Sequence, residues 1–209
     1  MTTSQEPTLL SQLAAQIRTC ERCPLAQTRR HAVPGEGPQD APFLLIGEGP
    51  GFHEDQQGRP FVGASGKLLE KLLASIGLRR ADVFITNVVK CRPPDNRDPQ
   101  PDEISACAPY LDQQIAAIQP RVIITLGRFS MARYFPGQTI TRVHGQHKEM
   151  DGRIHVPMFH PAAALRNPQW MTALQEDFAR LQPLVDTLYP QRMDALPPAQ
   201  PASQQLSWL

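Results

Sequence analysis

The sequence lacks the features of a membrane protein or of an exported one. No apolar run reaches the roughly 20 residues that cross a bilayer. Residues 1–6 do not have the basic-then-apolar profile of a secretion signal. We therefore expect a cytoplasmic protein.

Excess charge of either sign is also nearly absent. The chain has 21 Lys and Arg against 20 Asp and Glu, for a net charge of +1. This balance excludes a chain that is basic over its whole surface, so any contact with nucleic acid must come from local patches. The length of 209 residues, 41% of them hydrophobic, suffices for one sizeable core. We expect a single domain over residues 1–189 and, from the Pro-rich and Gln-rich composition of residues 190–209, a disordered tail.

Cysteine is scarce, and its spacing is informative. Cys20 and Cys23 form a C-x-x-C pair, and Cys91 and Cys107 follow much later. Disulfides are rare in the cytosol, so the four thiols together indicate one metal or cluster site. The residues alone fit zinc as well as an iron–sulfur cluster, because both accept four cysteines.

Short apolar runs alternate with amphipathic stretches along the chain. The pattern predicts strands at residues 44–46, 82–89, 121–127 and 153–159. It predicts helices over 7–19, from an N-cap at Ser65 to Ile76, and over 101–118, 129–135 and 168–188. Strands that alternate with helices imply an α/β fold in which a mainly parallel, four-stranded sheet is covered on both faces.

Polar side chains stand where three of these strands end. Glu48 follows the first strand within a glycine-rich turn, Asn87 lies near the end of the second, and His160 follows the fourth. Ligands of parallel sheets bind beyond the carboxyl ends of the strands. We therefore expect the three side chains to meet at one edge of the sheet.

Several sequence blocks, in this order, resemble the family 4 uracil-DNA glycosylases, the iron–sulfur members of the uracil-DNA glycosylase superfamily. The blocks are Cys20-x-x-Cys23, residues 33–37 (Val-Pro-Gly-Glu-Gly), 47–51 (Gly-Glu-Gly-Pro-Gly), 58–63 (Gly-Arg-Pro-Phe-Val-Gly), 85–94 (Ile-Thr-Asn-Val-Val-Lys-Cys-Arg-Pro-Pro), Cys107 and 160–168 (His-Pro-Ala-Ala-Ala-Leu-Arg-Asn-Pro). Each block alone is a weak signal, but the ordered set is highly specific.

The resemblance implies a three-layer α/β/α sandwich and a DNA repair enzyme. Such an enzyme flips uracil out of DNA and hydrolyses its N-glycosidic bond, the first step of base excision repair. The resemblance also implies one 4Fe-4S cluster per chain, with a structural role, on Cys20, Cys23, Cys91 and Cys107. A DNA repair enzyme of this kind would be associated with the nucleoid, and we expect it to be a monomer.

The chemistry of uracil excision assigns expected roles to residues of these blocks. Phe61 is placed to stack on the flipped ring, and the Asn87 amide matches the O4 acceptor and N3 donor of uracil. By resemblance, His160 and the backbone N–H groups of the Glu48–Gly49 turn stabilise the charge on the departing base. The uracil site therefore comprises Glu48, Gly49, Pro50, Phe61, Asn87 and His160, with Glu48 and His160 as catalytic residues. For DNA we expect phosphate contacts from arginines and a wedge from a leucine, namely Arg92, Arg97, Leu165 and Arg166.

The glycine-rich turn departs from that of the best-known uracil-DNA glycosylases. Gly49 and Gly51 stand where those enzymes have the Asp that orients water and the Tyr that excludes the methyl group of thymine. Glu48 is then the nearest carboxylate for water, and the thymine-excluding group is unassigned. Residues 90–97 contain no His, so we expect turnover without the covalent uracil adduct of a related branch.

Other interpretations of the sequence stay open at this point. The same fold acts in related glycosylases on other deaminated bases such as hypoxanthine, and a non-catalytic iron–sulfur DNA-binding protein is a further alternative. At the end of the chain, Gln205–Leu209 (Gln-Leu-Ser-Trp-Leu) resembles the short motif with which bacterial repair proteins bind the sliding clamp. It predicts the clamp as a partner.

Overall fold

The computed structural model describes residues 8–191. The strands are β1 Phe43–Gly47, β2 Phe84–Asn87, β3 Val122–Leu126, β4 Lys148–Met150 and β5 Arg153–Met158. The α-helices are α1 Leu9–Arg18, α2 Leu25–Thr28, α3 Phe52–Gln57, α4 Ala64–Ser75, α5 Pro101–Ile118, α6 Arg128–Ala132, α7 Ile140–Val143, α8 Pro161–Ala164, α9 Pro168–Ala179 and α10 Gln182–Leu188, with short 3-10 turns η1 Arg80–Asp82 and η2 Pro94–Asn96. Residues 192–209, which make up most of the predicted tail and include the predicted clamp motif at Gln205–Leu209, lie outside the described residues.

The central sheet has five strands in the order β2-β1-β3-β5-β4. All neighbours are parallel except β4 and β5, which form an antiparallel hairpin. The mainly parallel α/β architecture is thus confirmed, but the prediction of four strands was wrong. The missed strand β4 has three residues and no apolar alternation. Its hairpin turn, Asp151-Gly152, has positive φ at both residues, as a two-residue β-hairpin requires.

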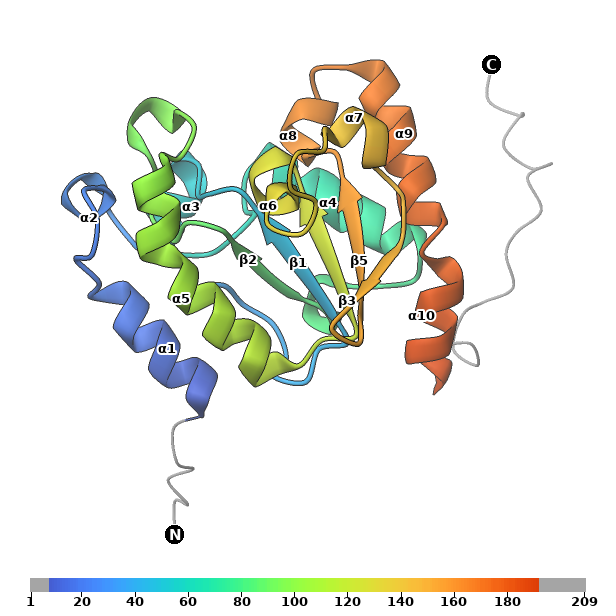
Figure 1. Ribbon diagram of the computed structural model, residues 1–209, viewed down its shortest axis with the longest axis horizontal. Coiled ribbons are helices and arrows are strands. Elements are labelled where there is room, and N and C mark those ends of the chain that lie inside the picture. Colours follow the sequence, from blue (N-terminus) through green and yellow to red (C-terminus); the bar gives the residue numbers. More distant parts are fainter. Residues whose placement is uncertain (1–7, 192–209) are drawn as a thin grey trace, which may run out of the picture.

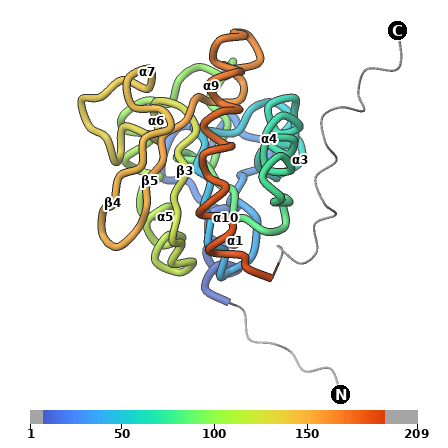
Figure 2. The backbone as a smooth tube through the Cα atoms, turned by 90° about the vertical axis from the view of Figure 1, so that its right-hand side faces the viewer, coloured from blue at the N-terminus to red at the C-terminus, as the bar shows by residue number. Residues whose placement is uncertain are grey.

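Helices cover both faces of the sheet and give three layers (Figures 1 and 2). Alternate residues of β1 point to opposite faces, as the period of a strand requires. Phe43 and Leu45 pack against α4, α9 and α10, and Leu44 and Ile46 pack against α1 and α5. Because both faces are buried, the central strands are continuous apolar runs, which is why the sequence revealed them.

Several helices differ from their predicted bounds. The N-cap of α4 is Gly63, and Ser65 lies inside the first turn of the helix, so the prediction of Ser65 as N-cap was wrong. The single helix predicted over 168–188 is two helices, α9 and α10, and Pro183 occupies the first turn of the second one, where its missing N–H is tolerated. The stretch between β1 and α4, for which the sequence pattern predicted no helix, contains α3. Within residues 8–191, no helix is both long and apolar enough to span a membrane.

The chain connectivity marks one edge of the sheet as the place for a ligand. From β1 the chain moves outward to β2 and then returns to the other side of β1 to form β3. In open α/β sheets, such a reversal leaves a crevice beyond the carboxyl ends of the two central strands. The ends of β1 and β2 are level there, since Gly47 pairs with Asn87.

Candidate active site

A cleft of about 550 Å³ lies at this edge of the sheet. The polar residues predicted at three strand ends all line it: Glu48, Asn87 and His160. So do Gly49, Pro50, Phe61, Arg97 and Arg166 among the predicted site residues. The structure thus brings together segments from the ends of β1, β2 and β5 with the loop that precedes α4.

Phe61 forms an aromatic wall of the cleft. Its ring stacks on the His160 ring, with centroids 5.6 Å apart and planes 25° from parallel. The Phe61 backbone has a φ of 51°, a left-handed conformation that costs a bulky residue on the order of 1–3 kcal/mol. The surrounding structure must therefore hold this residue in place.

Asn87 lies against that wall and is 1% exposed. Its Oδ1 atom is buried and accepts no hydrogen bond from the described part of the chain. A Cβ atom on Gly47 would lie 2.4 Å from Asn87 Oδ1 and 2.7 Å from the Phe61 ring, so only glycine fits at the end of β1. An unpaired buried acceptor costs about 1–3 kcal/mol, and a ligand that donates a hydrogen bond to it recovers that cost.

The geometry of His160 fixes its tautomer. Its Nδ1 atom accepts a hydrogen bond from the backbone N–H of Ala162 at 3.1 Å, as the N-cap of α8. Burial lowers the pKa of His160 to about 4, so the ring is neutral near pH 7. Because a backbone N–H can only donate, Nδ1 carries the lone pair and Nε2 carries the proton. His160 is therefore a neutral donor, a point that the sequence left open.

Glu48 is held against the start of α6. Its Oε1 atom accepts a hydrogen bond from the backbone N–H of Arg128 at 3.1 Å. Burial raises the pKa of Glu48, although a backbone hydrogen bond from Phe129 and the charge of Arg128 oppose that rise. Gly127 allows this approach, since a Cβ atom there would lie 2.4 Å from Glu48 Oε1.

The glycines of the turn after β1 leave no room for larger side chains. A Cβ atom on Gly49 would lie 2.8 Å from Val89 Cγ2, and one on Gly51 would lie 2.9 Å from Glu54 Oε2. The absence of an Asp and a Tyr from these two positions therefore agrees with the packing around the glycines.

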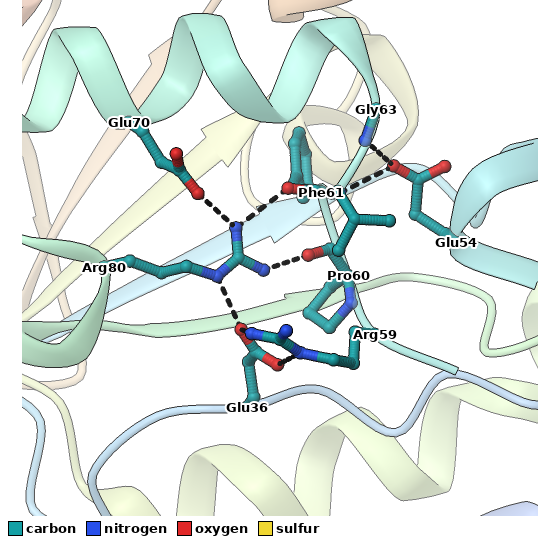
Figure 3. Close-up of polar contacts among 9 residues, drawn as sticks. Glu36, Glu54, Arg59, Pro60, Phe61, Gly63, Glu70 and Arg80 are labelled. Carbon is teal, nitrogen blue, oxygen red and sulfur yellow. Dashed lines mark hydrogen bonds and ion pairs between the residues drawn. The ribbon is translucent and has the colours of Figure 1, made fainter. Parts of the chain in front are cut away.

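Glu54 is a site residue that the sequence analysis missed. It is 8% exposed, and its carboxylate accepts hydrogen bonds from three backbone N–H groups, of Gly51 at 3.2 Å, Val62 at 2.9 Å and Gly63 at 3.0 Å. Figure 3 shows its contacts with the loop that carries Phe61, and the bond from Gly51 joins that loop to the turn after β1. The signal was the spacing of Gly51 and Glu54, which is that of an N-cap and the third residue of its helix.

The four residues predicted to contact DNA lie in different settings. Arg166 is exposed on the cleft wall, and Arg97 forms an ion pair with Glu103 at 2.6 Å. Arg92 lies outside the cleft lining, with its guanidinium 5.3 Å from the centre of the Phe52 ring. Leu165, at the end of α8, is 48% exposed, so it is not a core residue.

The four cysteines lie in one apolar cluster between α1, α5 and the residues after β2. Three of the sulfurs accept N–H groups: Cys107 Sγ from the Lys90 backbone at 3.3 Å, Cys91 Sγ from the Arg29 guanidinium at 3.2 Å, and Cys20 Sγ from the Arg22 backbone at 3.5 Å. Such donors favour ionised sulfur ligands.

Four thiols in one apolar cluster, three of them with N–H donors, are a ligand set that suits a sulfur-bound metal centre, either zinc or a 4Fe-4S cluster.

Comparisons with known proteins agree with this geometry. Residues 34–182 match the model of the uracil DNA glycosylase superfamily. The chain is 49% identical over 189 residues to the type-4 uracil-DNA glycosylase of Sulfurisphaera tokodaii, which covers 85% of this chain and 86% of that protein. It is 44% identical over 196 residues to the enzyme of the same name from Archaeoglobus fulgidus, and the match covers 90% of this chain and 98% of that protein. It is 44% identical over 162 residues to the enzyme from Thermotoga maritima, where the match covers 76% of this chain and 84% of that protein. The chain belongs to the type-4 uracil-DNA glycosylases, a branch of the uracil DNA glycosylase superfamily.

Proposed function

We propose that the chain excises uracil from DNA as the first step of base excision repair. The C1′–N1 bond breaks with its electron pair on uracil, water adds to C1′ and loses a proton, and the uracil anion takes up a proton, which leaves free uracil and an abasic site. Family membership supports the activity. The observation that carries it is the joint placement of Phe61, Asn87 and His160 around one cleft, with a buried acceptor unpaired in the described part of the chain.

Recognition of the flipped base rests on Phe61 and Asn87. Flipping costs a few kcal/mol, and stacking on an aromatic ring returns roughly 1–3 kcal/mol. The Asn87 Oδ1 atom accepts the N3–H of uracil, and its amide group donates to O4. Cytosine offers a bare N3 and an amine in those places, so both contacts are lost.

His160 and the turn after β1 stabilise the departing base. As the bond breaks, negative charge gathers at O2 and N1 of uracil. The Nε2–H group of neutral His160 and the backbone N–H of Gly49 are the donors for O2, and preorganised donors matter most when charge develops. Pro50 closes the same side of the pocket.

Glu48 supplies the carboxylate for water and for the cationic sugar. It lines the cleft beside the Asn87 strand and is fixed by the backbone at the start of α6. Outside the base pocket, we assign Leu165, which is exposed, to the gap in the duplex, and Arg166, Arg97 and Arg92 to contacts with phosphates.

The activity is tested with oligonucleotides that contain one uracil, hypoxanthine or cytosine. We expect release of free uracil and an alkali-labile site only with uracil, and a KM that rises steeply with salt because of the phosphate contacts. Glu48→Gln keeps an oxygen for the backbone of α6 but removes the charge, and we expect it to lower kcat by about 10²-fold.

The alternatives predict different outcomes for these assays. Hypoxanthine release would assign the fold another substrate, and binding without release would indicate a non-catalytic protein. A near-normal rate in Glu48→Gln would restrict Glu48 to shaping the turn.

A 4Fe-4S cluster on Cys20, Cys23, Cys91 and Cys107 supports the pocket. When bound, it supplies a rigid cross-link between α1, α5 and the residues after β2. Lys90 continues this cross-link to the pocket, because its backbone N–H binds Cys107 Sγ and its buried Nζ binds the backbone oxygen of Asn87 at 2.8 Å. We therefore assign the cluster a structural role.

Loss of one ligand tests this role. Cys107→Ser is expected to lower the iron content and to lower Tm by about 10 °C, given that domains of this size lose roughly 2–4 °C per kcal/mol. Iron analysis and thermal unfolding measure both. Gln113→Ala, an exposed change on the same helix, is the control. An iron-free protein with an unchanged Tm would contradict the structural role, and stoichiometric zinc would contradict the cluster.

A further inference from the structure

The loop that carries Phe61 is held by side chains from distant parts of the chain (Figure 3). Arg80, from η1, donates hydrogen bonds to the backbone oxygens of both Pro60 and Phe61, the latter at 2.8 Å. A planar guanidinium presents several N–H groups in fixed directions, so it can hold two successive carbonyls at once.

Glu36 fixes the direction of Arg80. Its Oε1 atom accepts from Arg80 Nε at 2.5 Å, and the Arg80 side chain is only 16% exposed. Burial alone would raise the pKa of Glu36, but hydrogen bonds from Arg59 and Arg80 outweigh burial and lower it, so the carboxylate is ionised at neutral pH. Arg80 also lies 3.4 Å from Glu70 of α4.

The Glu36–Arg80 pair is anchored to the strand that carries Asn87. The backbone of Glu36 pairs with Ile85 of β2 through two hydrogen bonds, of 3.0 Å and 2.8 Å. Ile85 is two residues before Asn87. The pair thus joins the Phe61 loop to the Asn87 strand, although neither Glu36 nor Arg80 itself lines the cleft.

The opposite side of the loop is held independently. Glu54 accepts the N–H groups of Val62 and Gly63, so the carbonyls of the loop are held by Arg80 and its amides by Glu54. Gly66 closes the remaining space, since a Cβ atom there would lie 1.8 Å from the Phe61 oxygen. These contacts offset the unfavourable left-handed backbone of Phe61.

We infer that Arg80, oriented by Glu36, is a positioning residue that sets the distance between the Phe61 ring and Asn87 and thereby the affinity of the pocket for uracil. The inference rests on the proposed function, in which these two side chains bind the base. It assigns a role in base affinity to residues that do not touch the base. Without Arg80, two carbonyls lose their donors and the loop relaxes away from Asn87.

The test compares Arg80→Met with Arg59→Met. Arg59 is itself a residue of the Phe61 loop and binds the same carboxylate of Glu36, at 2.8 Å and 3.1 Å, but its side chain is 58% exposed and donates to no backbone oxygen of the loop within residues 8–191. For Arg80→Met we expect the Ki of free uracil and the KM of a uracil oligonucleotide to rise by about 10-fold, because the stacking contact is weakened. For Arg59→Met we expect less than about a 2-fold change, as for an exposed ion pair.

A double mutant separates positioning from general stability. If Arg80 acts through Phe61, the Ki of the double mutant should exceed that of Phe61→Ala by less than about 2-fold. If the two residues act independently, the two rises in Ki multiply. Arg80→Lys, which keeps a donor but not the planar fork, should lie between the wild type and Arg80→Met in Ki, and it replaces Arg80→Met if that variant does not fold.

Each other outcome overturns a different statement. Three results would each refute the positioning role. The first is a wild-type Ki in folded Arg80→Met and Arg80→Lys, and the second is a rise in Ki in Arg59→Met equal to that in Arg80→Met. The third is a double mutant whose rise in Ki is the product of the two single rises. A wild-type protein that neither releases uracil nor binds it would refute the proposed function instead.

Discussion

His160→Asn is expected to lower kcat by about 10²–10³-fold, which is the usual cost of removing one donor for a developing oxyanion. Asn is a good N-cap, so it can still accept the N–H of Ala162 and keep α8 in place. Its shorter side chain does not place a donor where Nε2 of His160 lies. Single-turnover excision rates of the two proteins measure the difference. A rate within a few-fold of the wild type would remove His160 from the chemistry.

The pH dependence of kcat identifies the protonation state in which His160 is active. With a pKa of about 4, His160 stays neutral from about pH 8 down to about pH 5, so it should contribute no inflection of kcat near its ordinary value of 6.5. A loss of kcat as the pH rises through this ordinary value, absent from His160→Asn, would indicate that the charged form is needed.

The same pKa predicts a dependence of stability on pH. The folded-state pKa of about 4 is below the unfolded value of about 6.5, so the unfolded chain binds the extra proton between these values. Stability should therefore rise as the pH increases across that window, by up to about 3 kcal/mol from this group. Denaturant unfolding at several pH values measures the slope, and His160→Asn should show a smaller one.

The framework of the site was predictable because it follows from strand ends. The central strands are buried on both faces and are visible as apolar runs, and parallel strands bring their carboxyl ends to one edge. That reasoning placed Glu48, Asn87 and His160 together, and the cleft contains all of them. Strand β4 was missed because a three-residue edge strand has too few residues for a pattern. Its one signal was the Asp151-Gly152 turn.

The side chains that hold the pocket in shape were not predictable in the same way. Arg80 meets a loop about 20 residues earlier in the chain and a carboxylate, Glu36, that is 44 positions away. No local periodicity encodes such a contact. Glu54 was detectable only through its spacing from Gly51, which is typical of a helix N-terminus. That spacing does not predict the hydrogen bonds that its carboxylate accepts from the backbone N–H groups of Val62 and Gly63.

Asn87→Asp is expected to reduce the preference for uracil over cytosine by about 10²-fold or more, since sites that recognise a base by hydrogen bonds lose their selectivity when the donors change. The carboxylate keeps an acceptor but loses the amide donor that pairs with O4 of uracil. It also accepts a hydrogen bond from the N4 amine of cytosine, so excision of uracil should fall while excision of cytosine rises. Duplexes with uracil or cytosine opposite guanine, assayed under single-turnover conditions, give the ratio.

The control for that change is Asn87→Ala, which removes both contacts and adds none. It should lower uracil excision without any gain on cytosine, because no acceptor is left for the amine. Asn87 is 1% exposed, and a carboxyl group buried at its position in Asn87→Asp would resist ionisation, so the ratio is to be measured over a range of pH that covers both forms. If the uracil-to-cytosine ratio of Asn87→Asp stayed that of the wild type from about pH 6 to about pH 9, the amide of Asn87 could not be the group that tells the two bases apart.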